Sequence, residues 1–213
     1  MREPQDYILE LAKAIAEPSI LIGHRYIACG DECALRPEEA EFFKSAVPKV
    51  RRQAGAARIA ARQLLRILSY EDVSITKTCL GVPVWPPGIA GSLAHEEQVA
   101  VAAVARTADF LALGVDIEPA AELPDNLVDI IATPGERSLY EPEFLRGRQL
   151  FAAKEAVYKA LYPLDRHFLD FHDIEVDFEQ QIARASYGRL VSVKVSTGSH
   201  VIALAFLRAN GPV

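Results

Sequence analysis

The C-terminal part of the sequence constrains the fold most, because it contains four successive strand patterns with no helical pattern between them. Apolar and polar residues alternate in each, and turn residues separate them, at Asp173–Phe178, Ile182–Tyr187, Leu190–Ser196 and Val201–Leu207. Strands joined by short turns pair antiparallel with their neighbours. The end of the chain is therefore predicted to form an antiparallel meander.

Helical and strand patterns both occur throughout the rest of the chain. Apolar residues recur at helical spacing in 8–15, 50–68 and 149–161, and 125–139 is predicted to be helical with a break at Thr133-Pro134-Gly135. Pro163 is expected to stop the helix that precedes it. Strands are predicted over 19–28, 99–105 and 112–118. We expect an α+β architecture of two similar lobes, residues 1–118 and 119–213.

Composition excludes some classes of protein. The 213 residues are half hydrophobic and carry a net charge of −6, which disfavours a nucleic-acid-binding protein. Because the chain shows no secretory signal and no apolar run of membrane-spanning length, we expect a cytoplasmic protein that does not bind membranes. Three cysteines cannot all pair within one chain, and the Cys29–Cys33 spacing alone is a weak metal signal.

The stretch Gly114-Val-Asp-Ile-Glu118 carries the clearest chemical signal. Alternate side chains of a strand share a face, so Asp116 and Glu118 are expected to point the same way. Two carboxylates on one face repel each other unless a cation lies between them, and Mg²⁺ prefers oxygen ligands. Two solvated acids at the end of a strand are the alternative interpretation.

A second charged group lies on the helix predicted over 149–161. Phe151, Glu155 and Lys159 are spaced at i, i+4 and i+8, so they share one face of the helix, and Lys154 lies beside it. Glu155 would complete an Mg²⁺ site with the two strand carboxylates, and Lys159 would meet a phosphate. A surface ion pair between Glu155 and Lys159 is the alternative.

The basic residues of the first half form a third group. Arg58, Arg62 and Arg66 repeat every four residues along the predicted helix, close to Arg51 and Arg52. Arginine forks match phosphate oxygens, although a solvated helix face has the same spacing. His95 follows a short extended segment, and a single histidine is often structural.

Taken together, these motifs resemble the phosphopantetheinyl transferases of the surfactin-synthetase-activating type, and they look closest to the branch typified by the enterobactin synthetase component D. The resemblance rests on motifs occurring in order: Arg58-Ile-Ala-Ala61, Pro83-Val-Trp-Pro86, Gly91-Ser-Leu-Ala-His95, Gly114-Val-Asp-Ile-Glu118, Asp129-Ile-Ile-Ala-Thr-Pro134 and Phe151-Ala-Ala-Lys-Glu-Ala-Val-Tyr-Lys159. It extends from about residue 20 to the C-terminus.

The resemblance implies a fold of two similar α/β lobes in a pseudo-twofold arrangement, with coenzyme A between them and a monomer as the working unit. By similarity, the Mg²⁺ ligands are Asp116, Glu118 and Glu155, and the residues that bind coenzyme A are Arg51, Arg58, His95, Lys154 and Lys159. The partner is an apo carrier protein of a peptide-synthetase, polyketide or siderophore pathway, which docks on about residues 125–148.

The reaction implied by this resemblance is attack by a carrier serine on coenzyme A, with Glu155 as general base and Lys159 stabilising the phosphate. In the family a basic residue often precedes the Pro-x-Trp-Pro loop, where this chain has Gly81-Val82, so one phosphate contact is expected either to be lost or to be made by Lys77 instead. The alternatives are another Mg²⁺-dependent phosphotransferase or hydrolase, although no Walker loop is found, and a non-catalytic module that binds coenzyme A or carrier protein.

Overall fold

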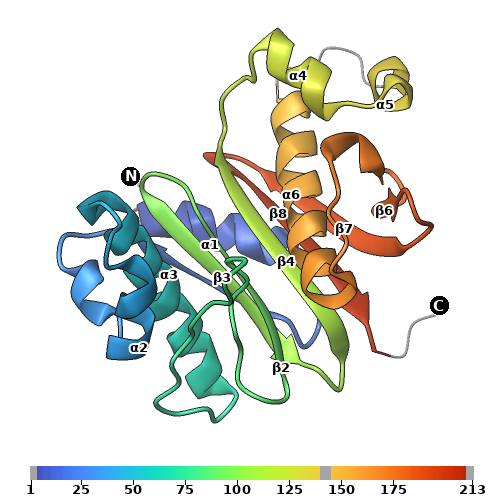
Figure 1. Ribbon diagram of the computed structural model, residues 1–213. Coiled ribbons are helices and arrows are strands. Elements are labelled where there is room, and N and C mark those ends of the chain that lie inside the picture. Colours follow the sequence, from blue (N-terminus) through green and yellow to red (C-terminus); the bar gives the residue numbers. More distant parts are fainter. Residues whose placement is uncertain (1–3, 140–144, 210–213) are drawn as a thin grey trace.

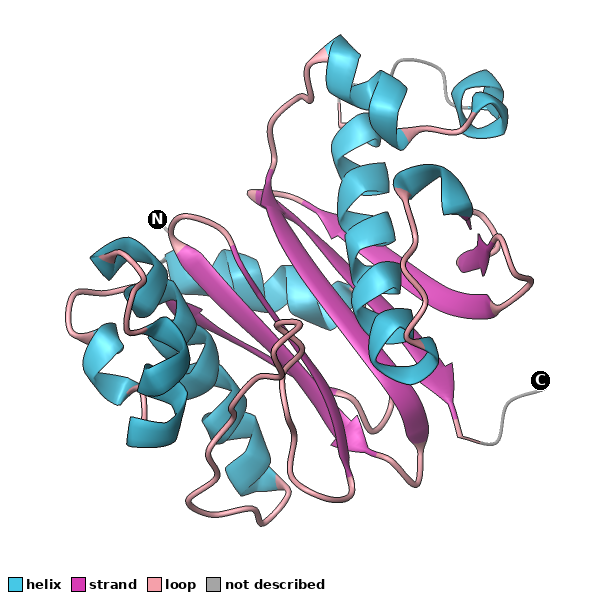
Figure 2. Cartoon of the chain, in the orientation of Figure 1, coloured by secondary structure: helices cyan, strands magenta, loops and turns pink. Residues whose placement is uncertain are grey.

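The computed structural model describes residues 4–139 and 145–209, which form two antiparallel sheets with helices packed on them (Figures 1 and 2). The first sheet has the strand order β1-β3-β2, and the second has the order β4-β8-β7-β6-β5. The first sheet contains β1 (Leu21–Tyr26), β2 (Ile89–His95) and β3 (Val99–Arg106). The second contains β4 (Phe110–Pro119), β5 (Ile174–Asp177), β6 (Ile182–Ala185), β7 (Leu190–Thr197) and β8 (His200–Arg208).

The helices flank these sheets. They are α1 (Pro4–Ala14), α2 (Pro37–Ala40), α3 (Pro48–Ile67), α4 (Asp125–Ile131), α5 (Pro134–Leu139) and α6 (Arg146–Asp165), with short 3₁₀ helices at Asp31–Ala34, Glu41–Phe43 and Phe171–Asp173. Figure 1 shows α3 beside the first sheet and α6 across a face of the second. None of the helices in the described part of the chain is long and apolar enough to cross a membrane.

The two lobes repeat one topology, which confirms the predicted α+β fold of two similar lobes. In each lobe a strand is followed by a 20-residue helix and then by two strands that pair with each other, and the last strand lies between the other two. A strand glycine lies under the helix in both: Gly23 against Leu64 of α3, and Gly114 against Ala156 of α6. The second lobe adds β5 and β6 at its far edge.

The boundary between the two sheets lies before residue 118, the position predicted from the sequence as the boundary between the lobes. β4 pairs with β8 along its length, so the whole acidic strand belongs to the second sheet, and the first sheet ends at Arg106. The lobes are not separable bodies, because Ile8, Leu11 and Ile15 of α1 share one apolar core with β3, β4 and β8. At the junction, the Ser92 hydroxyl of β2 accepts a hydrogen bond of 3.0 Å from the Val115 N–H of β4.

Most local predictions from the sequence are confirmed. The C-terminal strands form the expected antiparallel meander, and β8 returns to pair with β4. The break between α4 and α5 is a capping box, in which the Thr133 hydroxyl accepts from the Glu136 N–H and the Glu136 carboxylate accepts from the Thr133 N–H. The prediction for Pro163 was wrong by a few residues: α6 continues to Asp165 and ends where Arg166 adopts φ +53°. Proline removes only its own N–H donor, which is tolerated this close to the end of a helix.

Candidate active site between the lobes

The acidic end of β4 has the predicted alternation. Val115 and Ile117 are buried in the shared apolar core, whereas Asp116 and Glu118 point to the opposite face, toward α6. Asp116 is itself buried, with only 6% of its surface exposed. Its Oδ1 atom is paired, but its Oδ2 atom is buried without a hydrogen-bond partner. An unpartnered buried carboxylate oxygen is unfavourable unless a ligand completes it.

Helix α6 places its charged residues directly above this strand. Lys159 Nζ lies 2.6 Å from Asp116 Oδ1 and donates a longer hydrogen bond to the Val115 carbonyl. Glu155 lies one turn earlier on the same face and is also affected by the Asp116 charge. The close approach depends on Gly114, because a Cβ atom there would lie 1.8 Å from the Ala156 carbonyl oxygen of α6.

The three carboxylates have perturbed ionisation. Burial raises the pKa of Asp116, Glu118 and Glu155 above the ordinary carboxyl range, and the negative charge of Asp116 raises the pKa of the other two further. Lys159 opposes this rise at all three positions. One buried and two half-buried acids are thus only partly neutralised by the cations around them, which is typical of a site that receives another cation.

Arg148 is a member of this group that the sequence did not reveal. Its Nη1 atom donates to Glu118 Oε2 at 2.8 Å, and its other nitrogens donate to the Ala121 and Glu122 carbonyls. Arg148 therefore fixes the chain segment that follows β4 to the start of α6. No motif around Arg148 indicated this role, since the contact joins positions 30 residues apart.

The donor set is suited to Mg²⁺ but is not a preformed metal cage. Within residues 4–139 and 145–209, no three His, Cys, Asp and Glu side chains are already arranged to hold a metal ion. Instead, Lys159 forms an ion pair with Asp116, and Arg148 forms one with Glu118. The unpartnered Oδ2 atom of Asp116 and the raised carboxyl pKa values nonetheless fit a hard cation with oxygen ligands.

A cleft of about 690 Å³ adjoins this group at Lys159, which lines it, whereas Asp116, Glu118 and Glu155 are not among its lining residues. The cations that line it include Arg58, Lys77, His95 and Lys159, and its apolar lining includes Tyr158 and Phe168. Phe168 is 70% exposed at this wall although it is a large aromatic residue. The cleft thus offers cations to anionic groups and apolar surface to an uncharged chain.

The cations of the cleft are ordered by aromatic and backbone contacts. The Phe43 ring contacts both Lys77, whose Nζ is 4.2 Å from the ring centroid, and Arg58, whose guanidinium carbon is 5.0 Å from it. His95 is the last residue of β2, and burial of its ring, together with the Lys159 charge, lowers its pKa. Gly81 and Val82 line the cleft but contribute no cation, and Lys77 lines the same cleft.

Other basic residues expected at the ligand lie elsewhere. Lys154 is 1% exposed, does not line the cleft, and donates three hydrogen bonds, to Glu136 and to the carbonyls of Ile131 and Phe171. All three of its donors are therefore used, and we assign it a structural role. Arg51 also does not line the cleft, and Arg62 is paired with Glu39.

Sequence comparisons agree with this architecture. Residues 38–105 match the 4'-phosphopantetheinyl transferase N-terminal domain, and residues 112–205 match the 4'-phosphopantetheinyl transferase superfamily. The two matches meet between β3 and β4, where the sheets divide.

Three relatives show the extent of the similarity. The chain is 36% identical over 161 residues to the 4'-phosphopantetheinyl transferase Npt of Nocardia iowensis, which covers 74% of this chain and 72% of the relative. It is 38% identical over 148 residues to Svp of Streptomyces mobaraensis, covering 67% and 60%. Enterobactin synthase component D of Escherichia coli strain K12 is 35% identical over 138 residues, covering 60% and 63%.

An acidic group beside a basic cleft, at the junction of two similar α/β lobes, is an arrangement suited to transfer of a phosphate-linked group. The chain belongs to the 4'-phosphopantetheinyl transferase superfamily and is a transferase of that class.

Proposed function

We propose that this chain transfers the phosphopantetheine arm of coenzyme A to a serine of an apo carrier protein and releases 3′,5′-ADP. The observation that carries the proposal is the convergence of Asp116, Glu118, Glu155 and Lys159 beside a cleft lined by cations. The cleft offers Arg58, Lys77 and His95 to the nucleotide phosphates. Its apolar lining suits the pantetheine arm, which is a long and uncharged chain.

The residues of the site have different roles in the proposed reaction. The serine oxygen attacks the phosphorus that carries pantetheine, and the bond from that phosphorus to the bridging oxygen breaks, so that oxygen leaves with 3′,5′-ADP. Glu155 accepts the serine proton, for which its raised pKa suits it. Lys159 moves from Asp116 to the phosphate and stabilises the charge that develops there.

Asp116, Glu118 and Glu155 are the residues that would hold Mg²⁺. The ion would neutralise and orient the diphosphate of coenzyme A. Arg148 keeps Glu118 at the edge of the site.

The partner and setting are also proposals. The relatives named enterobactin synthase component D support a carrier of a siderophore or peptide-synthetase pathway. Residues 125–148 are the segment we propose for carrier docking. Ile130 and Leu127 are exposed apolar residues of this segment, on α4. Residues 140–144 of the segment lie outside the described part of the chain. Residues of both lobes of one chain line the cleft, which supports a monomer; a cytoplasmic location is part of the proposal.

The test is transfer of fluorescent coenzyme A to a panel of apo carrier proteins in the presence of Mg²⁺. The wild-type chain is expected to label at least one carrier covalently, and Glu155→Gln is expected to fold but to label at least about a hundredfold more slowly, as for loss of a general base. Glu175→Gln, on the exposed face of β5, is the matched control. Wild-type labelling by Glu155→Gln would refute the base assignment, and tight binding of coenzyme A without labelling would indicate a binding module.

A further inference from the structure

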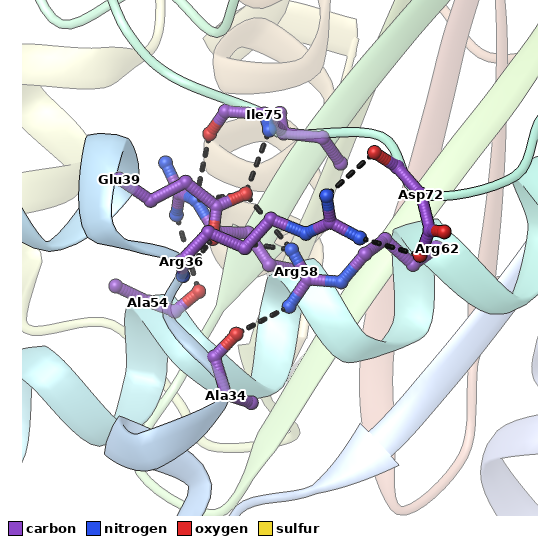
Figure 3. A network of polar contacts seen from close by, with 8 residues as sticks. All are labelled: Ala34, Arg36, Glu39, Ala54, Arg58, Arg62, Asp72 and Ile75. Carbon is purple, nitrogen blue, oxygen red and sulfur yellow. Dashed lines mark hydrogen bonds and ion pairs between the residues drawn. The ribbon is translucent and has the colours of Figure 1, made fainter.

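Glu39, at the end of α2, is a fully buried carboxylate outside the cleft. Its side chain is 0% exposed, and Figure 3 shows donors converging on it from several segments. Oε1 accepts from the Ile75 N–H at 2.6 Å and from Arg62 Nη1 at 2.8 Å, and Oε2 accepts from the Arg36 N–H at 2.9 Å. A buried charge is tolerated only when it is paired and hydrogen-bonded to this extent.

Glu39 and Arg58 bind the same residue from two sides. While Glu39 accepts from the Ile75 N–H, Arg58 Nε donates to the Ile75 carbonyl at 2.8 Å, and Arg58 Nη1 donates to the Ala54 carbonyl at 3.1 Å. Arg58 Nε also lies 3.7 Å from Glu39 Oε1. Glu39, Ile75 and Arg58 therefore form a closed ring of polar contacts, which fixes the guanidinium plane in one orientation.

This ring supports the cations of the cleft. Arg58 lines the cleft, and its Nη2 atom donates no hydrogen bond to any described residue, so that atom is left for a ligand. Ile75 is two positions before Lys77, the second cation that flanks Phe43. Fixing Ile75 thus sets the start of the segment that brings Lys77 to the cleft.

The charge of Glu39 matters as well as its hydrogen bonds. Arg58 and Arg62 are close enough that the charge of Arg62, like burial, lowers the pKa of Arg58, and Glu39 opposes both effects. Two buried guanidinium groups without a carboxylate between them repel each other. Neutral glutamine at position 39 would also turn amide hydrogens toward at least one of the N–H groups that Glu39 now accepts from.

We propose that Glu39 is a positioning residue for the coenzyme A site: it holds Arg58 and the Ile75–Lys77 segment in the orientation that binds the 3′-phosphate of coenzyme A. The inference rests on the proposed function, in which Arg58 and Lys77 face the nucleotide phosphates, and it assigns these two cations to the 3′-phosphate. Glu39 itself does not line the cleft and does not touch the reacting atoms.

The test compares Glu39→Gln with Glu38→Gln, an exposed neighbour on the same helix. Binding of coenzyme A and of 3′-dephospho-coenzyme A is measured by calorimetry without carrier protein, and labelling kinetics are measured separately. We expect Glu39→Gln to weaken coenzyme A binding and raise its KM by about tenfold or more, the factor of one charged hydrogen bond. The kcat, the KM for the carrier and the affinity for 3′-dephospho-coenzyme A should stay within about twofold.

Two results would contradict the proposal. Unchanged coenzyme A affinity in a folded Glu39→Gln protein, or an equal loss for both nucleotides, would show that Glu39 is only a structural residue. If Glu39→Gln does not fold, the double variant Glu39→Gln/Arg62→Met removes both buried partners together, and it must show the same selective loss. A wild-type chain that binds coenzyme A but labels no carrier refutes the proposed transfer and not the role of Glu39, because binding is read without carrier.

Discussion

Replacing Gly114 with alanine should separate the helix of the active site from its strand. The new Cβ atom would lie 1.8 Å from the Ala156 carbonyl oxygen, which is about 1.6 Å short of an ordinary contact, and 2.8 Å from the Ala160 nitrogen. Both neighbours are backbone atoms, so no side-chain rotation relieves the overlap. α6 must move away from β4, carrying Glu155 and Lys159 away from Asp116.

Overpacking of this kind destabilises a core by typically about 1–3 kcal/mol, and backbone neighbours place this site near the upper value. For a chain of this size that corresponds to a fall in Tm of roughly 6–12 °C. A displacement of about 1 Å in the catalytic groups reduces a rate by about a hundredfold. We therefore expect Gly114→Ala to lower both the Tm, read by circular dichroism, and the rate of carrier labelling.

Gly135→Ala is the matched control, because its Cβ atom would meet nothing closer than the Thr133 hydroxyl at 3.8 Å. This variant should keep the wild-type Tm to within a few degrees. If Gly114→Ala unfolds at the wild-type temperature and labels carrier at the wild-type rate, the direct contact between β4 and α6 does not set the geometry of the site.

Two further predictions concern the buried charges. Because burial raises the pKa of Asp116, Glu118 and Glu155, their ionisation destabilises the fold in the absence of a cation, so stability falls as pH rises through those raised pKa values. Mg²⁺, which binds only the ionised carboxylates, should therefore raise the Tm clearly at about pH 8 and little at about pH 5, and equal shifts at both would count against these ligands. Lys154→Met should reduce the free energy of unfolding by about 3–5 kcal/mol by leaving Glu136 buried and unpaired, without changing the KM for coenzyme A. Denaturant unfolding and labelling kinetics check this, and a raised KM for coenzyme A in a stable variant would show that Lys154 contributes to ligand binding.

The sequence predicted the features that depend on local periodicity. Alternation along β4 placed Asp116 and Glu118 on one face, and the helical spacing placed Glu155 and Lys159 together, because strand and helix periods fix the direction of side chains. The break at Thr133-Pro134-Gly135 was also predicted, because the capping box that forms it lies within four residues. The pair of similar lobes was implied by the family resemblance rather than by any periodicity, and the strand order within them was not predicted.

Features set by contacts distant in the sequence were not readable in the same way. Arg58 and Arg62 have the spacing of one exposed stripe, but α2 and the segment near Ile75 cover them, 17 or more residues away. Lys154 is next to Glu155 in the sequence yet points into the core, toward Glu136. Arg148 carries no local motif, and Glu39 belongs to the local capping box of α2, but only the folded chain brings Arg148 to Glu118 and Glu39 to Ile75 and Arg62.

The ion pair between Lys159 and Asp116 links two binding events. One ammonium group cannot serve the Asp116 carboxylate and a ligand phosphate at full strength together, so a cation bound at Asp116 would leave Lys159 available for the phosphate. If both ligands of the proposed reaction bind, each would increase the affinity for the other by the same factor, as thermodynamic reciprocity requires. This one contact would then make the binding of coenzyme A and of Mg²⁺ cooperative.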